Sequence, residues 1–185
     1  MQQYQQALHP LLAHEVIIMP TDTIYGLVCR AVSTDAVEHI YTLKNRDLSK
    51  PPVILIASYN DLETLGIILS PFQKEYSQGV WPGGVSLIID VRVQDRERLA
   101  YLHRGQNSLA IRMTDLPLLA DLIQEIGPLA TSSANSAEQP FAQSIEQAHR
   151  YFGEAITTYV DDGPRPNVTP SRIIDLRGDE VVVIR

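Results

Sequence analysis

Cysteine, aromatic residues and basic charge are all scarce in this sequence. Of its 185 residues one is cysteine, and aromatic residues make up 6%. A single cysteine excludes an internal disulfide framework and any zinc site built on several thiolates. With 15 Lys and Arg against 22 Asp and Glu, the net charge is -7, which argues against nucleic-acid binding across a broad basic face. Such a protein can hold phosphates only through a few cations gathered at one place.

The N-terminal region has no long hydrophobic run. Its longest apolar stretch, residues 16–19, is far too short to span a bilayer, and it does not follow the charge pattern of a signal peptide. We therefore expect a cytoplasmic protein. The sequence also lacks both common glycine-rich phosphate-binding motifs and the G-x-S-x-G nucleophile motif. Its 5 histidines have no metal-ligand spacing, so no metal site is assigned, and Cys29 is expected to be a small buried apolar residue.

Alternating helix and strand patterns predict an α/β fold in one domain, residues 1–185. The chain is 44% hydrophobic, and folding at this length removes roughly 70% of the unfolded surface from water. We expect helices over 4–12, 34–44, 71–78, 116–126 and 145–152, the fourth capped by Asp115, and a short helix capped by Asn60 or Asp61. We expect strands over 16–19, 53–57, 86–91, 108–113, 129–132, 155–160, 172–176 and 181–184. The last two strands form a hairpin, so the sheet should be mixed rather than purely parallel.

A threonine-rich segment, P-T-D-T-I-Y-G-L at 20–27, directly follows the first expected strand. Hydroxyls at Thr21 and Thr23 would then lie at the carboxyl end of a strand, where open α/β sheets bind ligands. An ordinary turn, with Tyr25 in the core, is the alternative. Asp22, between the two threonines, is a candidate metal ligand.

Three cations lie within seven residues at the end of the second expected helix: Lys44, Arg46 and Lys50. Stabilisation of the helix dipole explains one or two of them, at about 1 kcal/mol or less each. Three cations framed by Pro51 and Pro52 fit a phosphate site better. Arginine binds phosphate through two parallel hydrogen bonds and lysine acts as a point charge, so this combination suits a polyphosphate.

Two further polar segments follow expected secondary structure. The run T-S-S-A-N-S at 131–136 offers small hydroxyls and an amide that allow close approach of a ligand, although a plain serine-rich loop has the same composition. The segment W-P-G-G at 81–84 predicts a tight turn that supports the site wall rather than doing chemistry.

Taken in order, these segments resemble the YrdC/TsaC family of threonylcarbamoyl-adenylate synthases. The matching motifs are P-T-D-T-I-Y-G-L at 20–27, K-N-R with K-P at 44–51, W-P-G at 81–83, L-A-I-R at 109–112, T-S-S-A-N at 131–135 and P-S-R-I-I-D at 170–175. The resemblance implies a single-domain twisted mixed sheet with flanking helices around a deep cationic cavity. It also implies the formation of threonylcarbamoyl-AMP and pyrophosphate from L-threonine, bicarbonate or CO2, and ATP with Mg2+. Partner enzymes that modify tRNA would then use the adenylate, and the synthase itself would contact tRNA weakly or indirectly.

The resemblance also assigns roles to individual residues. It implies that Lys44 and Arg46 serve catalysis. It places ATP against Lys44, Arg46, Lys50, Ser108, Ser133, Asn135 and Arg185. It places threonine against Thr23, Arg112, Thr131 and Ser171. No covalent nucleophile is required, which agrees with the absence of a catalytic triad.

The sequence departs from the family pattern at several positions, including Asp47 in the cationic loop, Leu55 and Phe141. Three alternatives stay open. One is a YciO-type paralogue with the same fold and an unassigned activity. Another is a HypF-like carbamoyl-transfer module, although this chain lacks the zinc fingers and acylphosphatase domain that accompany it. The third is a non-catalytic RNA-binding module, which the net charge of -7 disfavours.

Overall fold

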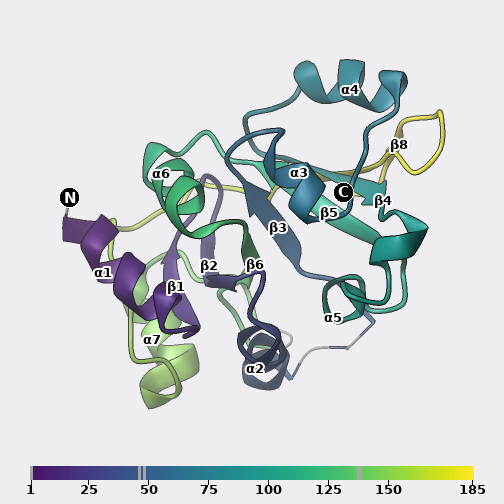
Figure 1. Ribbon diagram of the computed structural model, residues 1–185. Helices are drawn as coiled ribbons and strands as arrows, with labels where there is room; N and C mark the ends of the chain where they lie inside the picture. Colours follow the sequence, from purple (N-terminus) through teal and green to yellow (C-terminus); the bar gives the residue numbers. More distant parts are fainter. Residues whose placement is uncertain (1, 46, 48, 137–138) are drawn as a thin grey trace.

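A computed structural model describes residues 2–45, 47, 49–136 and 139–185 (Figure 1). Its strands are β1 (Ile17–Pro20), β2 (Tyr25–Arg30), β3 (Val53–Ile56), β4 (Val85–Asp90), β5 (Ser108–Met113), β6 (Leu129–Ser133), β7 (Arg172–Asp175) and β8 (Val182–Val183). Its α-helices are α1 (Gln2–Leu12), α2 (Thr34–Lys44), α3 (Asp61–Thr64), α4 (Pro71–Gln78), α5 (Ala100–His103), α6 (Pro117–Ile126) and α7 (Ile145–Phe152). Short 3-10 turns cover Val93–Asp95 and Gly153–Ala155. None of the helices within these ranges has the length and apolar character needed to cross a bilayer.

The strands form one mixed sheet in the order β1-β2-β6-β3-β5-β4-β7-β8. The pairs β3–β5 and β4–β7 are parallel, and the other neighbouring pairs are antiparallel. The predicted α/β class and mixed sheet are therefore confirmed. The expected terminal hairpin is also present, since Ile174 pairs with Val183 across β7 and β8.

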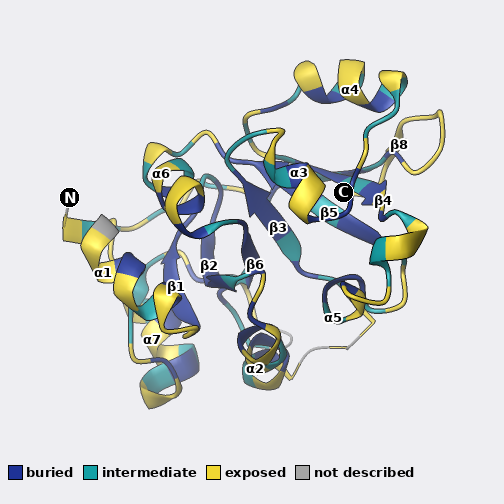
Figure 2. Cartoon of the chain, viewed as in Figure 1, coloured by how far each residue is buried: buried dark blue, intermediate teal, exposed yellow. Residues whose placement is uncertain are grey.

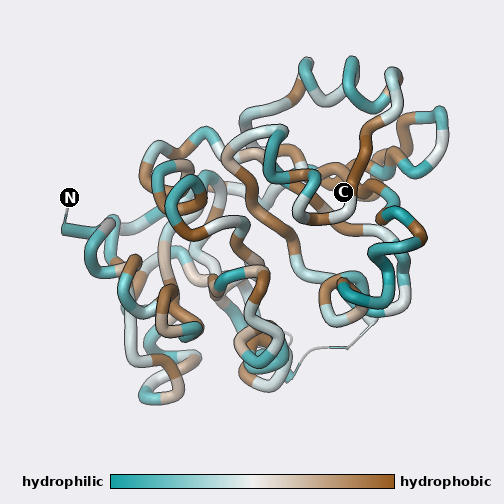
Figure 3. Tube along the Cα trace, in the orientation of Figure 1, coloured by the Kyte–Doolittle hydropathy of each residue, from teal (hydrophilic) through white to brown (hydrophobic). Residues whose placement is uncertain are grey.

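Consecutive side chains along the strands belong alternately to two apolar clusters on opposite faces of the sheet. Helices α1 and α6 cover one face, where Leu11 and Leu122 pack with Ile17 and Leu55. The neighbouring Ile54 and the residues of α2 and α7 belong to the other cluster. This two-residue period is what a strand buried on both faces produces. Figure 2 shows the strands buried beneath exposed outer helix faces, and Figure 3 shows the hydrophobic stretches concentrated along the same strands.

Serine caps and prolines mark the starts of α4, α6 and α7. Ser70 accepts a hydrogen bond from the Gln73 backbone N–H, and the Gln73 side chain accepts one from the Ser70 N–H, which forms a complete capping box before Pro71. Ser144 caps α7 in the predicted position. The prediction that Asp115 caps α6 is wrong.

Helix α6 begins at Pro117, and its N-cap is Leu116 in extended backbone. The residue before a proline is disfavoured in the helical region, so Pro117 takes the first helical position and the helix cannot start directly after Asp115.

Two strand predictions need correction. Strand β2 was missed because the threonine-rich motif reads as a turn and Gly26 weakens the strand pattern. The strand expected over 155–160 is absent: the segment makes only an isolated bridge, in which Ile18 pairs with Tyr159. The parallel ladder would continue through an N–H of Pro20, which proline lacks.

The W-P-G-G segment forms the predicted tight turn between α4 and β4. The Trp81–Pro82 peptide is cis, and Gly83 has a φ of 147° that side-chain-bearing residues rarely adopt. The Gly83 N–H donates to the Met113 carbonyl at 2.9 Å, and the Trp81 indole N–H donates to the Val85 carbonyl at 2.8 Å. These bonds fix the turn against β4 and the end of β5.

Candidate functional site

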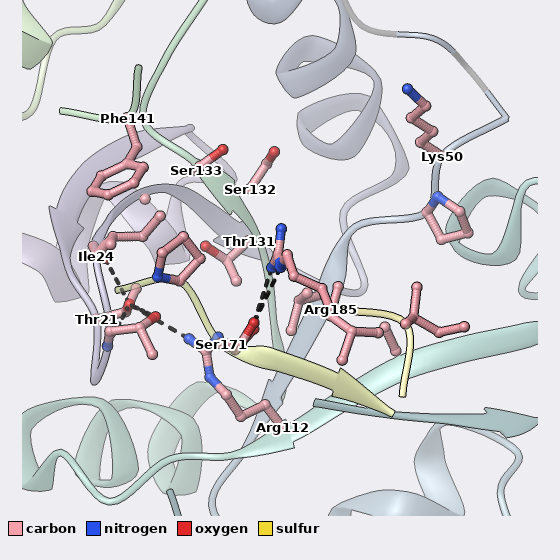
Figure 4. A pocket seen from close by; sticks show the side chains of 18 of the residues that line it. Thr21, Ile24, Lys50, Arg112, Thr131, Ser132, Ser133, Phe141, Ser171 and Arg185 are labelled. Atoms are coloured by element: carbon pink, nitrogen blue, oxygen red, sulfur yellow. Dashed lines mark hydrogen bonds between the residues drawn. The ribbon is translucent and has the colours of Figure 1, made fainter. Parts of the chain in front are cut away.

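A cavity of about 650 Å³ opens along the sheet, and most of the predicted site residues line it (Figure 4). The predicted residues in its wall are Thr23, Lys50, Ser108, Arg112, Thr131, Ser133, Asn135, Ser171 and Arg185. They come from five of the motifs quoted above, apart from Ser108, which directly precedes the L-A-I-R motif, and Arg185, the last residue of the chain. Two predicted residues are not in this wall. Lys44 lies behind it, and Arg46 lies outside the described residues.

The charged side chains of the cavity wall are all basic among the residues described. They are Lys50, Arg112, Arg177 and Arg185, and no Asp or Glu joins them. The chain as a whole carries a net charge of -7. The cations are thus concentrated where an anionic ligand could enter, as the composition requires of a phosphate-binding protein.

The P-T-D-T turn after β1 is fixed by its own hydroxyls. The Thr21 Oγ1 lies 3.1 Å from the Thr23 Oγ1 and donates to the Ile24 carbonyl at 2.7 Å. The Thr23 N–H donates to the Thr21 Oγ1 at 3.2 Å. From outside the turn, the Arg165 Nη1 donates to the Thr21 carbonyl at 2.6 Å. Two buried hydroxyls therefore face the cavity in a fixed position.

Arg112 lies on β5 and forms a buried ion pair with Asp22. Its Nη2 is 2.8 Å from the Asp22 Oδ1, and the side chains are only 4% and 0% exposed. The same Nη2 donates to the Thr21 Oγ1 at 3.4 Å. Burial raises the pKa of the Asp22 carboxyl, and the neighbouring guanidinium offsets part of that rise. The carboxylate of Asp22, the candidate metal ligand, is thus paired with Arg112 and does not line the cavity.

Gly26 and Thr131 meet across β2 and β6. Gly26 pairs with Ser133 in register, and a Cβ at Gly26 would lie 2.6 Å from the Thr131 Oγ1. The Thr131 hydroxyl donates to the Leu27 carbonyl at 3.1 Å. This close approach explains why the strand contains a glycine: only hydrogen fits between its backbone and the threonine in the cavity wall.

Lys44 joins the S-x-N segment in one hydrogen-bonded network. Its ammonium donates to the backbone carbonyls of Ser133 and Asn135, the second at 2.7 Å, and to the Asn135 Oδ1 at 2.8 Å. The Ser133 hydroxyl donates to the same Oδ1 at 2.6 Å. The Asn135 amide N–H donates to the Gln139 carbonyl at 2.7 Å. The structure thus brings together Lys44, Ser133 and Asn135, as the sequence motifs imply.

Lys50 stands apart from this network. It is exposed, and its backbone carbonyl accepts a 2.8 Å hydrogen bond from the Tyr41 hydroxyl. On the preceding residue, the Ser49 carbonyl accepts a bond from the Gln106 side chain at 3.4 Å. The end of the cationic loop is thereby held between α2 and the segment before β5, with Lys50 in the cavity wall.

Ser171 and Arg185 lie together at another part of the cavity. The Nε and Nη2 of Arg185 donate to the Ser171 carbonyl at 3.2 and 3.1 Å, and the Ser86 hydroxyl donates to the Ser171 Oγ at 3.0 Å. Figure 4 shows Arg185 reaching into the cavity from the segment after β8. The C-terminal hairpin thus brings the last residue of the chain to the site.

Several wall residues were not predicted from the sequence, among them Ile24, Gln106, Phe141 and Arg177. Ile24 lies inside a quoted motif but was given no role of its own, and Phe141 was noted only as a departure from the family pattern. Gln106 and Arg177 lie in turns with no motif of their own. Only the fold reveals that these turns border the cavity.

Cys29 is fully buried on β2, as predicted. Burial raises the pKa of its thiol to about 12, so it is no nucleophile near neutral pH. Among the residues that the structure describes, no three His, Cys, Asp or Glu side chains gather to hold a metal ion. The chemical groups of the site are therefore hydroxyls, an amide, backbone groups and cations.

The chain is an α/β protein with one mixed sheet and a cation-lined cavity. Within that class it belongs to the Sua5/YciO/YrdC family: residues 10–185 match the family model, which is described as "Telomere recombination".

Named relatives and solved structures agree with this assignment. The chain is 34% identical over 175 residues to a threonylcarbamoyl-AMP synthase of Marinobacter nauticus, covering 92% of this chain and 89% of the relative. A crystal structure of P. abyssi Sua5 complexed with L-threonine superposes with a TM-score of 0.84 at 26% identity, over 99% of this chain and 53% of that one. E. coli YciO shares the fold with a TM-score of 0.84 at 21% identity, over 100% of this chain and 88% of that one.

Proposed function

We propose that this chain is a threonylcarbamoyl-AMP synthase, which joins L-threonine, bicarbonate or CO2, and ATP and releases pyrophosphate. The observation that carries the proposal is the cavity, whose wall combines the hydroxyls of the P-T-D-T turn, the S-x-N motif and the cations Lys50, Arg112, Arg177 and Arg185. Relatives that bear this name share about a third of the sequence over nearly the whole chain. The single domain of residues 1–185 would contain the complete site.

Threonine would bind beside the P-T-D-T turn. Arg112 offers a guanidinium that can hold the amino acid's carboxylate, and its charge is nearly buried, which strengthens that bond. The hydroxyls of Thr23, Thr131 and Ser171 would provide neutral donors and acceptors for the amine and side chain. The complex of P. abyssi Sua5 with L-threonine supports an amino-acid substrate for this fold.

ATP would bind along the S-x-N segment and the cationic loop. Ser133 and Asn135 lie in the cavity wall, and Lys44 behind them adds a positive charge that their carbonyls partly screen. Lys50, Arg185 and Ser108 would complete the nucleotide contacts. We include Arg46 among the nucleotide contacts only because it belongs to the K-N-R motif.

The reaction needs positioning and charge stabilisation rather than covalent catalysis. Neutral threonine amine attacks CO2 through its nitrogen, and loss of the amine proton leaves a carbamate. A carbamate oxygen then attacks the α-phosphorus of ATP while the bond to the pyrophosphate oxygen breaks. Two anions must meet in this step, and the basic cavity wall offsets their repulsion.

Mg2+ fits the site as a companion of ATP. The described residues gather no cluster of three acidic, His or Cys ligands, so phosphate oxygens and water would supply most of the coordination. Bound in this way, the ion would neutralise charge on the pyrophosphate leaving group. Lys44 and Lys50 would orient the same phosphates from the protein side.

The adenylate would serve partner proteins that form threonylcarbamoyladenosine in tRNA, and we place the synthase in the cytoplasm as part of the same proposal. With a net charge of -7, this chain need not bind tRNA across its own surface. A YciO-type role is the nearest alternative, but the identity to YciO is 21%, which carries the fold only.

Pyrophosphate release tests the proposal directly. The protein is incubated with ATP, Mg2+, bicarbonate and L-threonine, and pyrophosphate is measured with and without the amino acid. We expect release that depends on threonine. Release without threonine dependence, or salt-sensitive RNA binding without ATP turnover, would contradict the proposal.

A further inference from the structure

Asp22 is placed behind the cavity wall rather than in it. Its neighbours Thr21 and Thr23 both contribute to the wall, and Asp22 between them does not. Its side chain is fully buried and reaches Arg112, whose own side chain is 4% exposed and does line the cavity. The side chain of Asp22 is therefore linked to the cavity through Arg112.

The contact between the two residues uses one edge of each group. The Asp22 Oδ1 accepts from the Arg112 Nη2 at 2.8 Å. The Asp22 Oδ2 and the Arg112 Nε are both buried without a hydrogen-bond partner among the described residues. A bidentate pair would occupy both carboxylate oxygens and more of the guanidinium. Because Asp22 contacts only one nitrogen of the guanidinium, the group can still donate hydrogen bonds to a second carboxylate.

These two unpaired buried atoms lower the stability of the protein when no ligand is bound. Burying polar atoms without hydrogen-bond partners destabilises the folded protein. The Thr21 Oγ1, which accepts from the same Nη2 at 3.4 Å, ties the ion pair to the turn that carries Thr23. Arg112 thus lines the cavity while its Nε is left without a hydrogen-bond partner among the described residues.

We propose that Asp22 is a positioning residue that holds Arg112 for the carboxylate of the amino-acid substrate. This inference rests on the proposed function, since it takes the amino acid's carboxylate as the ligand of Arg112. Asp22 contacts no substrate and moves no proton. It fixes the direction of the guanidinium, so that the protein selects amino acids with a free carboxylate over analogues without one.

Calorimetric binding of L-threonine and of L-threoninamide, which lacks the carboxylate, tests the inference. In the unaltered protein we expect threonine to bind at least ~10-fold more tightly, about 1.4 kcal/mol. Asp22→Ala should remove most of this preference, and Asp22→Asn should keep part of it because an amide oxygen can still accept from Arg112. A loss of folded protein would lower the binding stoichiometry for both ligands without changing the ratio of their affinities.

A double-substitution cycle separates positioning from a general effect of charge. Arg112→Gln should abolish the preference, and adding Asp22→Asn to it should change nothing further. Asp95→Asn is the matched control, because Asp95 pairs with Arg92 and Arg98 away from the cavity wall. It should leave the ratio unchanged.

The contrary results are distinct. If Asp22 only compensates the charge of Arg112, then Asp22→Asn will strengthen threonine binding and raise the ratio, which would overturn the inference. An unchanged ratio in Asp22→Ala that is folded and binds with the stoichiometry of the unaltered protein would do the same. If the unaltered protein binds neither threonine nor its amide, the proposed function fails and the inference fails with it.

Discussion

The ammonium of Lys44 lies 2.8 Å from the side-chain oxygen of Asn135, although 91 residues separate them in the chain. The bond joins the end of α2 to the loop after β6, and Ser133 donates to the same oxygen. Lys44 is only 6% exposed, so this charge is committed to shaping the S-x-N loop as well as to attracting phosphate. Two motifs that are distant in sequence therefore form one unit.

Replacement of Lys44 should damage both the loop and the reaction. Lys44→Met removes the donor to two backbone carbonyls and the Asn135 side chain, so we expect turnover to fall at least ~10-fold. Steady-state kinetics of pyrophosphate release measure it. Lys74→Met, on the exposed side of α4, is the control and should keep full turnover. Unchanged kinetics in Lys44→Met would contradict the role given to the network.

Gly26→Ala should distort the cavity wall where β2 meets β6. The added Cβ would lie 2.6 Å from the Thr131 Oγ1 and 3.3 Å from the Ser132 carbonyl, so the two strands must separate. We expect a loss of about 1–3 kcal/mol of stability and weaker threonine binding, measured by chemical denaturation and calorimetry. Gly178→Ala, where a Cβ would meet nothing within 4 Å, is the matched control. Equal stability of the two variants would refute the close-approach argument.

Loss of the Ser70 cap should weaken the fold without touching the site. Ser70→Ala removes one half of the capping box of α4, which typically costs about 1 kcal/mol. Urea denaturation should show a lower midpoint with an unchanged slope. Threonine-dependent turnover of the folded variant should stay the same, since neither Ser70 nor Gln73 lines the cavity. A changed KM would show that the helix acts on the site.

Cys29 should be unreactive in the folded protein. Its pKa of about 12 leaves almost no thiolate at pH 8, and the side chain is fully buried. A thiol reagent such as Ellman's reagent should react only after denaturation. Rapid labelling of the native protein would contradict the burial of β2.

The same thiol has a consequence for stability at high pH. The unfolded thiol, with its ordinary pKa near 9, loses its proton before the folded one does. Between about pH 9 and 12 the folded state binds more protons, so this group makes stability fall as the pH rises. Cys29→Ala should remove that part of the slope, measured by denaturation across this range.

Much of the fold could be predicted from local sequence signals. The capping serines, the prolines at helix starts and the apolar runs located α4, α7, β5 and the terminal hairpin. The errors arose where a partner far along the chain decides the outcome. Residues 155–160 were expected to pair as a strand, but Pro20 on the neighbouring strand has no N–H to continue the ladder.

The candidate site could likewise be predicted only in part from the sequence. Motifs predicted the residues that carry charge or hydroxyls, and nine of those residues line the cavity. No local pattern could reveal that Asp22 pairs with Arg112 across 90 residues, or that Arg177 and Gln106 border the same cavity. Those relationships depend on the tertiary structure, since Asp22 lies between β1 and β2 and Arg112 lies on β5, which is no neighbour of either strand in the sheet.

Isotope tracing of the product tests the central claim most directly. The protein is incubated with ATP, Mg2+, L-threonine and carbon-13 bicarbonate, and the nucleotide products are examined by mass spectrometry. The account predicts an adenylate that contains threonine and one carbon-13 atom, formed in equal amount with pyrophosphate. Cleavage of ATP with no labelled threonine adenylate, by protein that is folded and binds ATP, would contradict it.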